Sequence, residues 1–376
     1  MHPRTPLLAA VLLTVAPSLA QNPAAPEYYK LEDTQGRTIE AVILSVEDGQ
    51  VTLRTKAGRT STVSLDKFAE ISQKDILGWQ AESGGTQQTA GSGDWNVETI
   101  SESTEKSIYR TRHFEVNCDS LLSANIVAQF TPILEGTYYA LRSLPLGSLR
   151  PEPAEGDRFS VGILEDERSF RVLAGRIPDS AVGSYNHSNK ELLLPIARIG
   201  ITKSNGAFSV RPVRRNPGLV HETTLLLLQK DIESLPPWLV KGVAEYLAAA
   251  DYRDQKLVFQ NHNKNIARHL QDVYKISPKA IPVTPFDRLV GLDYPSWTAS
   301  SEKERQSFTV SSMLAIYFLT ELDNQGRNLR SYTSALTSGK EAGDALAQAL
   351  NGRSFDEFSA DMQAALTRQG LTIAKG

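Results

Sequence analysis

A short segment with adjacent histidine and glutamate holds the clearest metal chemistry in this chain. Residues 216–225 read NPGLVHETTL, and the Asn-Pro pair is typical of a helix start. Histidines four residues apart lie on one helix face and bind zinc together, while a glutamate beside the first activates the metal-bound water. His221 and Glu222 supply two of these groups, but Leu225 follows His221 by four residues. The segment therefore predicts a zinc-site helix that lacks its second histidine.

A second helix is predicted to start at the prolines of residues 235–246, which read LPPWLVKGVAEY. Together the two segments resemble the gluzincin metallopeptidases, particularly the peptidase-MA-like branch of exported bacterial proteins. That family has His-Glu-x-x-His on one helix and Pro-Pro-Trp-Leu-x-Glu-Gly-x-Ala-Glu-Tyr on the next. The glutamate before glycine is its third zinc ligand, which leaves a fourth position open for water. The resemblance implies a peptidase-MA-like domain over residues 103–376.

Set against this family pattern, two of the three zinc ligands are missing. Leu225 stands in place of the second histidine, and Lys241 stands in place of the ligand glutamate. Leucine cannot bind a metal, and a charged lysine repels one. We therefore interpret His221, Glu222, Leu225, Lys241 and Glu245 as a vestigial motif, with no catalytic residue, metal or other cofactor expected. Lys241 is expected to replace the charge of the metal, close to Glu222 or Glu245.

Two other interpretations of these residues remain open. Lys241 and Glu245 are four residues apart on one helix, so they could form an ordinary surface ion pair. Alternatively, a metal could persist on substitute ligands. His262 and His269 follow seven residues apart, and His221, Glu245 and His262 would form such a site.

The first twenty residues have the features of a secretory signal peptide. Arg4 precedes an apolar run too short to span a bilayer, and small residues at positions 18 and 20 predict cleavage before Gln21. We therefore expect an exported protein, periplasmic or extracellular, that does not insert into the membrane after cleavage. Cys118 is the only cysteine, which excludes an intramolecular disulfide.

The charge balance excludes some partners. The 40 Lys and Arg residues and the 43 Asp and Glu residues give a net charge of −3. A nucleic-acid-binding protein would show a basic surface, so no nucleic-acid partner is expected.

Residues 26–80 are predicted to form a small β unit. Short apolar-polar alternations are separated by turn signals at Gly36, Gly49 and Gly58, and a short helical piece follows Asp66 and ends near Trp79. The pattern GRTIEA, GQVTLR, GR, VSLDKF and SQKD resembles the SLA1 homology domain 1 family, although Leu31 stands where that family has tryptophan. The resemblance implies an SH3-like barrel and an adaptor that binds protein partners.

A linker rich in Gly, Ser, Thr and Gln is predicted over residues 81–102. In the domain that follows, we expect a strand over 109–116, then a long helix capped by Asp119 or Ser120 and kinked at Pro132. A strand over 158–164, a helix over 165–174 and a hairpin over 182–195 should follow. From residue 216 onward the chain is predicted to be mainly helical, with capping boxes that start at Ser301 and Ser354.

The chain as a whole is predicted to be α+β: a small SH3-like barrel and a gluzincin-like domain with a mainly helical C-terminal half. The first functional hypothesis is an exported pseudo-peptidase that binds a protein or peptide partner. The second is an active metallopeptidase with unusual zinc ligands, and the third is an adaptor that acts through the barrel.

Overall fold

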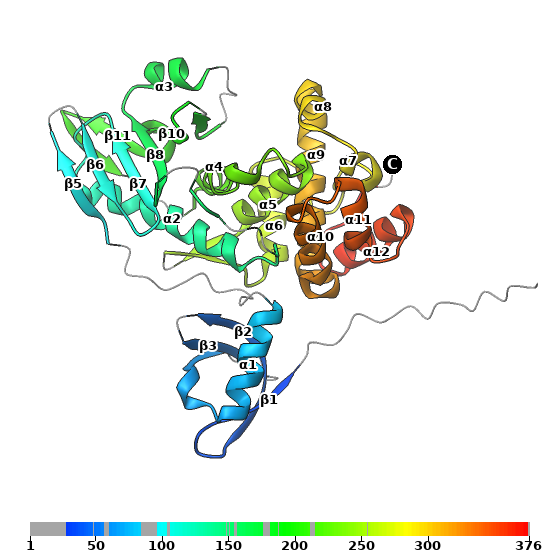
Figure 1. The fold of residues 1–376 in the computed structure, drawn as a ribbon. Coiled ribbons are helices and arrows are strands. Elements are labelled where there is room, and N and C mark those ends of the chain that lie inside the picture. Colours follow the sequence, from blue (N-terminus) through cyan, green and yellow to red (C-terminus); the bar gives the residue numbers. More distant parts are fainter. Residues whose placement is uncertain are drawn as a thin grey trace, which may run out of the picture.

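The computed structural model describes residues 28–374 apart from 48, 56–59, 84–95, 104–105, 148, 150, 154–155, 176–180, 187, 211–214 and 254. The predicted signal peptide and its cleavage site lie outside the described residues. The fold is α+β, as predicted: the sheets lie in the first two thirds of the chain, and helices fill the rest (Figure 1). No described helix is long and apolar enough to cross a membrane.

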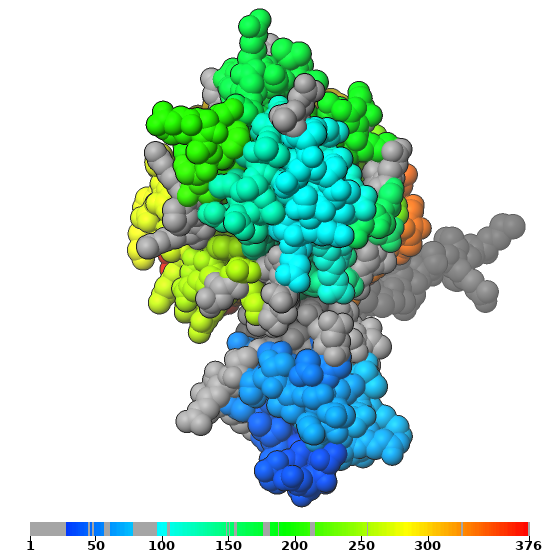
Figure 2. Space-filling model, turned by 90° about the vertical axis from the view of Figure 1, so that its left-hand side faces the viewer, coloured from blue at the N-terminus to red at the C-terminus, as the bar shows by residue number. Residues whose placement is uncertain are grey.

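The N-terminal unit is a four-stranded antiparallel sheet whose strands pair in sequence order. Its strands are β1 (Tyr29–Glu32), β2 (Thr38–Glu47), β3 (Gln50–Thr55) and β4 (Thr60–Ser64). A 3-10 turn (Leu65–Lys67) and helix α1 (Glu70–Ser83) follow, so the helical part is longer than the sequence predicted. Buried Leu31, Ile43, Leu53 and Ile76 form a core that is separate from the core of the rest of the chain. Figure 2 shows this unit as its own lobe.

The predicted linker boundaries were wrong at both ends. Helix α1 continues to Ser83, and β5 (Glu98–Glu102) is a strand of the second sheet. The Gly- and Ser-rich residues 84–95 between them lie outside the described part of the chain.

The second sheet has the strand order β5-β6-β7-β8-β10-β9. Its further strands are β6 (Ser107–Arg110), β7 (Phe114–Cys118), β8 (Phe159–Leu164), β9 (Ser184–Asn186) and β10 (Glu191–Pro195). The strand predicted over 109–116 is therefore two antiparallel strands, β6 and β7. The turn between them is held by Glu135, which is fully buried and accepts hydrogen bonds from the Thr111 hydroxyl and the His113 backbone. The predicted hairpin of β9 and β10 is confirmed.

Helix α2 (Ala124–Ser143) is buried along most of its length, and the centre of its Tyr138 ring lies 6.2 Å from that of Phe159 on β8. Its N-cap residue is Ser123 rather than Asp119 or Ser120, because Leu122 N–H still bonds the Ser120 carbonyl in the turn before the helix. The helix continues through Pro132, and the buried surface on both sides of the proline stabilises it there. The shorter helix α3 (Glu167–Ala174) follows β8, as predicted.

The C-terminal half is mainly helical, as predicted. Its helices are α4 (Pro217–Leu227), α5 (Pro237–Ala249), α6 (His262–Asp272), α7 (Phe286–Val290), α8 (Tyr294–Ala299), α9 (Glu302–Tyr317), α10 (Arg327–Thr337), α11 (Ala342–Leu350) and α12 (Phe355–Arg368). A π-helical turn, η4 (Phe318–Leu322), continues α9. Two small hairpins are β11 (Ile201–Ser204) with β12 (Ala207–Val210), and β13 (Asp251–Arg253) with β14 (Lys256–Val258). Both predicted capping boxes are present.

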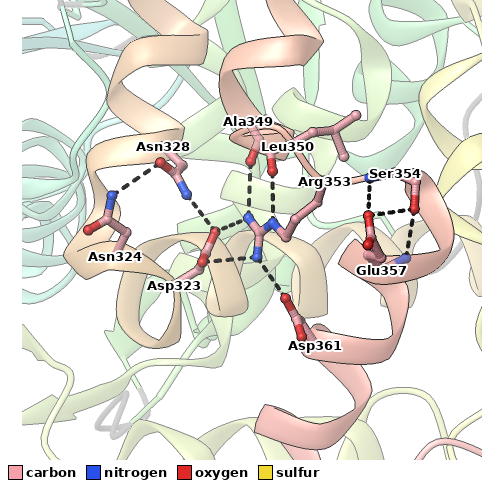
Figure 3. Close-up of polar contacts among 9 residues, drawn as sticks. All are labelled: Asp323, Asn324, Asn328, Ala349, Leu350, Arg353, Ser354, Glu357 and Asp361. Atoms are coloured by element: carbon pink, nitrogen blue, oxygen red, sulfur yellow. Dashed lines mark hydrogen bonds and ion pairs between the residues drawn. The ribbon is translucent and has the colours of Figure 1, made fainter. Parts of the chain in front are cut away.

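Arg353 links helices α11 and α12 to the end of η4 through its side-chain contacts (Figure 3). Its guanidinium donates to both carboxylate oxygens of Asp323, at 2.7 and 3.2 Å, and to the carbonyl of Leu350 at 2.7 Å. It also donates to Asp361 on α12 at 3.3 Å and lies 5.0 Å from the centre of the Phe358 ring. Because a planar guanidinium can make all of these contacts at once, this single residue joins three segments.

Candidate functional site

Helices α4 and α5 position the vestigial motif, and local signals fix where each begins. The Asn216 side chain accepts a 2.9 Å hydrogen bond from Leu219 N–H, and Pro217 occupies the first helical position of α4. Pro236 is the N-cap residue of α5, and Pro237 is its first helical residue. Trp238 then lies fully buried, with its ring centre 5.5 Å from that of Tyr332 on α10. The proline pair and the tryptophan therefore fix α5 in the core.

Gly242 lets α5 approach α9 closely. A Cβ atom at this position would lie 2.7 Å from the Ser312 carbonyl oxygen and 2.8 Å from the Ile316 side chain. Real side chains do not come this close, so only glycine fits without a backbone shift. The glycine in the motif thus sets the position of the helix that carries Lys241 and Glu245.

The structure brings His221 and Glu245 together across the two helices. Nδ1 of His221 lies 2.8 Å from Oε1 of Glu245, although this close contact lacks the alignment of a hydrogen bond. The His221 side chain is 17% exposed and that of Glu245 only 9%, so solvent reaches the histidine. A carboxylate on one imidazole nitrogen orients the ring and turns the other nitrogen away. Nε2 is thus the His221 nitrogen directed away from Glu245.

His269 on α6 contacts the other oxygen of Glu245. Its Nε2 lies 2.7 Å from Oε2, and Arg215 faces its Nδ1 at 3.5 Å. Because arginine only donates, Nδ1 accepts and Nε2 carries the proton that reaches Glu245. Burial would raise the pKa of Glu245, but the two histidines offset it and hold this pKa well below its usual range. Glu245 is therefore an ionised carboxylate between two imidazoles.

Sequence reasoning missed part of this cluster. Tyr274 lies beside it, with its ring centre 5.7 Å from that of His269, and burial together with Glu245 raises the pKa of Tyr274 well above its usual value. Arg215 and Tyr274 reach the site from segments before α4 and after α6, and no spacing rule in the sequence connects these segments with Glu245. One usable signal for this cluster is present in the sequence: His269 follows His262 by seven residues in a part of the chain predicted to be mainly helical.

Lys241 does not pair as predicted. Within the described residues it forms no ion pair with Glu222 or Glu245, because His221 and His269 already occupy both oxygens of Glu245. Lys241 nonetheless acts on Glu222 through its charge. Burial raises the pKa of Glu222, and the charges of His221 and Lys241 oppose this rise. The alternative expectation, an ordinary surface ion pair of Lys241 with Glu245, is therefore not met among the described residues.

His262 lies apart from Glu245. It is 2% exposed, and its ring centre is 4.6 Å from that of Tyr246 and 5.1 Å from that of Phe259. Neither ring nitrogen has a hydrogen-bond partner among the described residues, and burial lowers the pKa of His262 to about 3. The substitute site of His221, Glu245 and His262 is therefore not assembled, since His269 contacts Glu245 in its place.

Tyr246, the neighbour of Glu245 on α5, contacts a second carboxyl that is half-buried. The Tyr246 hydroxyl donates a 2.7 Å hydrogen bond to Glu321 in η4. Burial raises the pKa of Glu321 to about 7, and the hydrogen bond from Tyr246 only partly opposes this. Two consecutive residues of α5 therefore belong to different carboxyl environments. Glu245 is itself an ionised carboxylate, and Tyr246 bonds Glu321, which is protonated more readily.

The described residues contain no group of three or more His, Cys, Asp or Glu side chains arranged to hold a metal ion. Leu225 and Lys241, at two positions of the zinc motif expected from the sequence, have no side-chain group that serves as a zinc ligand. No protein-family model matches this chain, and no curated protein matches it.

Proposed function

We propose that this chain is an exported pseudo-peptidase: a gluzincin-like domain without zinc or hydrolytic activity that binds a protein or peptide partner. An SH3-like module of the SLA1 homology domain 1 type precedes it. The contact between His221 and Glu245 carries the proposal. In zinc enzymes a carboxylate commonly holds the second nitrogen of a ligand histidine and orients it toward the metal. Here Glu245 lies 2.8 Å from Nδ1 of His221 in the corresponding place, while Leu225 and Lys241 stand where two ligands would be required.

The chemistry left at this position suits binding. His221 is partly exposed, with Nε2 directed away from Glu245, and Lys241 adds a positive charge next to Glu222. An imidazole nitrogen and an ammonium group can both hold the carbonyl or carboxylate oxygens of a peptide. Because Leu225 and Lys241 replace two of the three protein ligands of an open zinc site, these groups offer no means to activate water as zinc does. We therefore infer that the site retains peptide contacts without hydrolysis.

Digestion of a peptide library tests this proposal. The full chain is incubated with a mixed-sequence peptide library and added zinc, and cleavage products are read by mass spectrometry. We expect no products from the natural chain. Cleavage that disappears in Glu222→Gln would contradict the proposal and favour the metallopeptidase with unusual ligands.

Export is tested separately, by N-terminal sequencing of the protein from an exported fraction. We expect Gln21 as the first residue. An intact Met1 in that fraction would contradict the proposed cleavage.

A further inference from the structure

A polar cavity of about 240 Å³ lies away from the vestigial motif. It forms where β7 and β8 begin, beside the turn between β9 and β10 and the end of α4. Glu115 and Arg158 line it from the sheet, Lys190 lines it from the turn, and Phe159, Tyr185 and Leu226 add apolar surface. His221, Lys241 and Glu245 are not part of its lining. The cavity is therefore a separate place where this chain could hold a small ligand.

Arg158 is fixed in the cavity wall. Its Nε donates a 3.1 Å hydrogen bond to the Thr111 carbonyl, and its Nη1 lies 2.6 Å from Asp157. The Arg158 side chain is 26% exposed, while that of Asp157 is 80% exposed. An exposed carboxylate competes weakly for a guanidinium because water screens the pair. The fixed guanidinium is thus prepared to take a ligand carboxylate.

The cavity lining has both signs of charge. Arg158, Lys190 and Lys230 are matched by Glu115, Glu152 and Asp157. Lys230 pairs with Glu152, but both side chains are more than half exposed, so this pair is easily exchanged for ligand contacts. Glu115 is held from the neighbouring strand by Arg110 at 2.9 Å. A ligand with one charge can replace only one partner of these exposed pairs, whereas a ligand with both charges can replace both partners.

We propose that this cavity binds a short peptide in its zwitterionic form, with the carboxylate at Arg158 and Lys190 and the ammonium group at Glu115 and Glu152. The aromatic and aliphatic surface of Phe159, Tyr185 and Leu226 then contacts an apolar side chain. This binding site is independent of the proposed pseudo-peptidase function, because it uses none of the residues of the vestigial motif.

Calorimetric titration of the full chain with glycyl-L-phenylalanine tests this proposal. The N-acetylated peptide lacks the ammonium group, and the C-terminal amide lacks the carboxylate. We expect the free dipeptide to bind, and binding at least tenfold weaker for each blocked peptide. Equal affinity for all three peptides, or no binding of the free dipeptide at millimolar concentration, would overturn the proposal.

Lys190 offers a variant that separates binding from folding. Its backbone has φ of +50°, a conformation that glycine adopts more readily than lysine. Lys190→Gly should therefore keep the melting temperature while it weakens dipeptide binding at least fivefold. Lys275 has the same backbone conformation, with φ of +57°, but does not line the cavity, so Lys275→Gly is the matched control.

Two further variants complete the test. Glu115→Gln, which keeps the side-chain shape, should weaken the free dipeptide more than its N-acetylated form. Glu341→Gln, which changes an exposed carboxylate outside the cavity lining, should leave dipeptide binding unchanged. If Lys190→Gly and Glu115→Gln bind the dipeptide like the natural chain, the dipeptide binds elsewhere and the proposal fails.

Discussion

Glu245 lies between two histidines from different helices, 2.8 Å from Nδ1 of His221 and 2.7 Å from Nε2 of His269. This buried carboxylate joins α4, α5 and α6 in one polar cluster. A buried charge is tolerated only when its partners satisfy it, so the cluster should be sensitive to the loss of any member.

Replacement of Glu245 by glutamine tests this sensitivity. Glu245→Gln removes the charge that both histidines face, and we expect a loss of about 2–4 kcal/mol in the free energy of unfolding. Urea unfolding at pH 7 measures it. Glu341 is exposed, so Glu341→Gln is the control and should change little. A loss for Glu245→Gln no larger than that of the control would show that the cluster does not stabilise the fold.

Acid should weaken the same cluster. Because the pKa of Glu245 is lower in the folded than in the unfolded protein, its stabilisation is present above the unfolded pKa and is lost as the pH falls through the folded pKa. Below pH 4.5 the natural chain should therefore lose stability with pH more steeply than Glu245→Gln. Parallel pH curves for the two proteins would contradict the assignment.

Glu321 should act in the opposite direction. Its pKa is raised to about 7 in the folded chain, so the folded state holds this proton more tightly than the unfolded state. The resulting stabilisation is fully present below about pH 4.5 and is lost as the pH rises through 7, with a size of up to about 3 kcal/mol. Glu321→Gln should flatten the stability curve between pH 5 and 8, as measured by urea unfolding. An unchanged slope would refute the raised pKa.

The close approach of α5 and α9 gives a packing prediction. Gly242→Ala places a methyl group against the Ser312 carbonyl, and we expect a loss of about 1–3 kcal/mol from overpacking. A Cβ atom on Gly343 of α11 would meet no other atom within 4 Å, so Gly343→Ala should be neutral or stabilising through helix propensity. Thermal unfolding of both variants measures the difference. Equal melting temperatures would mean that the two helices can separate at little cost.

Arg353 gives a prediction about side-chain shape. Arg353→Lys keeps the charge but cannot contact Asp323, Asp361 and Leu350 together, so we expect a loss of about 2 kcal/mol or more. Arg288 forms an exposed ion pair with Glu304, and Arg288→Lys should cost little. Chemical unfolding compares the two variants, and equal stabilities would refute the role given to Arg353.

The sequence predicted those parts of the fold that local signals determine. The N-cap and proline pairs located the starts of α4 and α5, and the capping boxes located α9 and α12, because each signal acts within one helical turn. The turn between β6 and β7 was missed because it depends on Glu135, 22 residues away from His113 in the sequence.

The candidate site was predictable only in part. The motif placed His221 and Glu245 on successive helices, and their contact follows from how these helices pack. The contact of His269 with Glu245 depends on how α6 packs against α5, and helical spacing within one segment cannot indicate it. Lys241 failed to pair for the same reason, since the competing histidines come from other helices.

Zinc content tests the central proposal most directly. The full chain and the double variant Leu225→His with Lys241→Glu are purified without chelator, and zinc is measured by elemental analysis. We expect essentially no zinc in the natural chain and about one zinc per chain in the double variant, whose three protein ligands would match those of an open zinc site. Stoichiometric zinc in the natural chain that is lost in His221→Ala would contradict the pseudo-peptidase proposal.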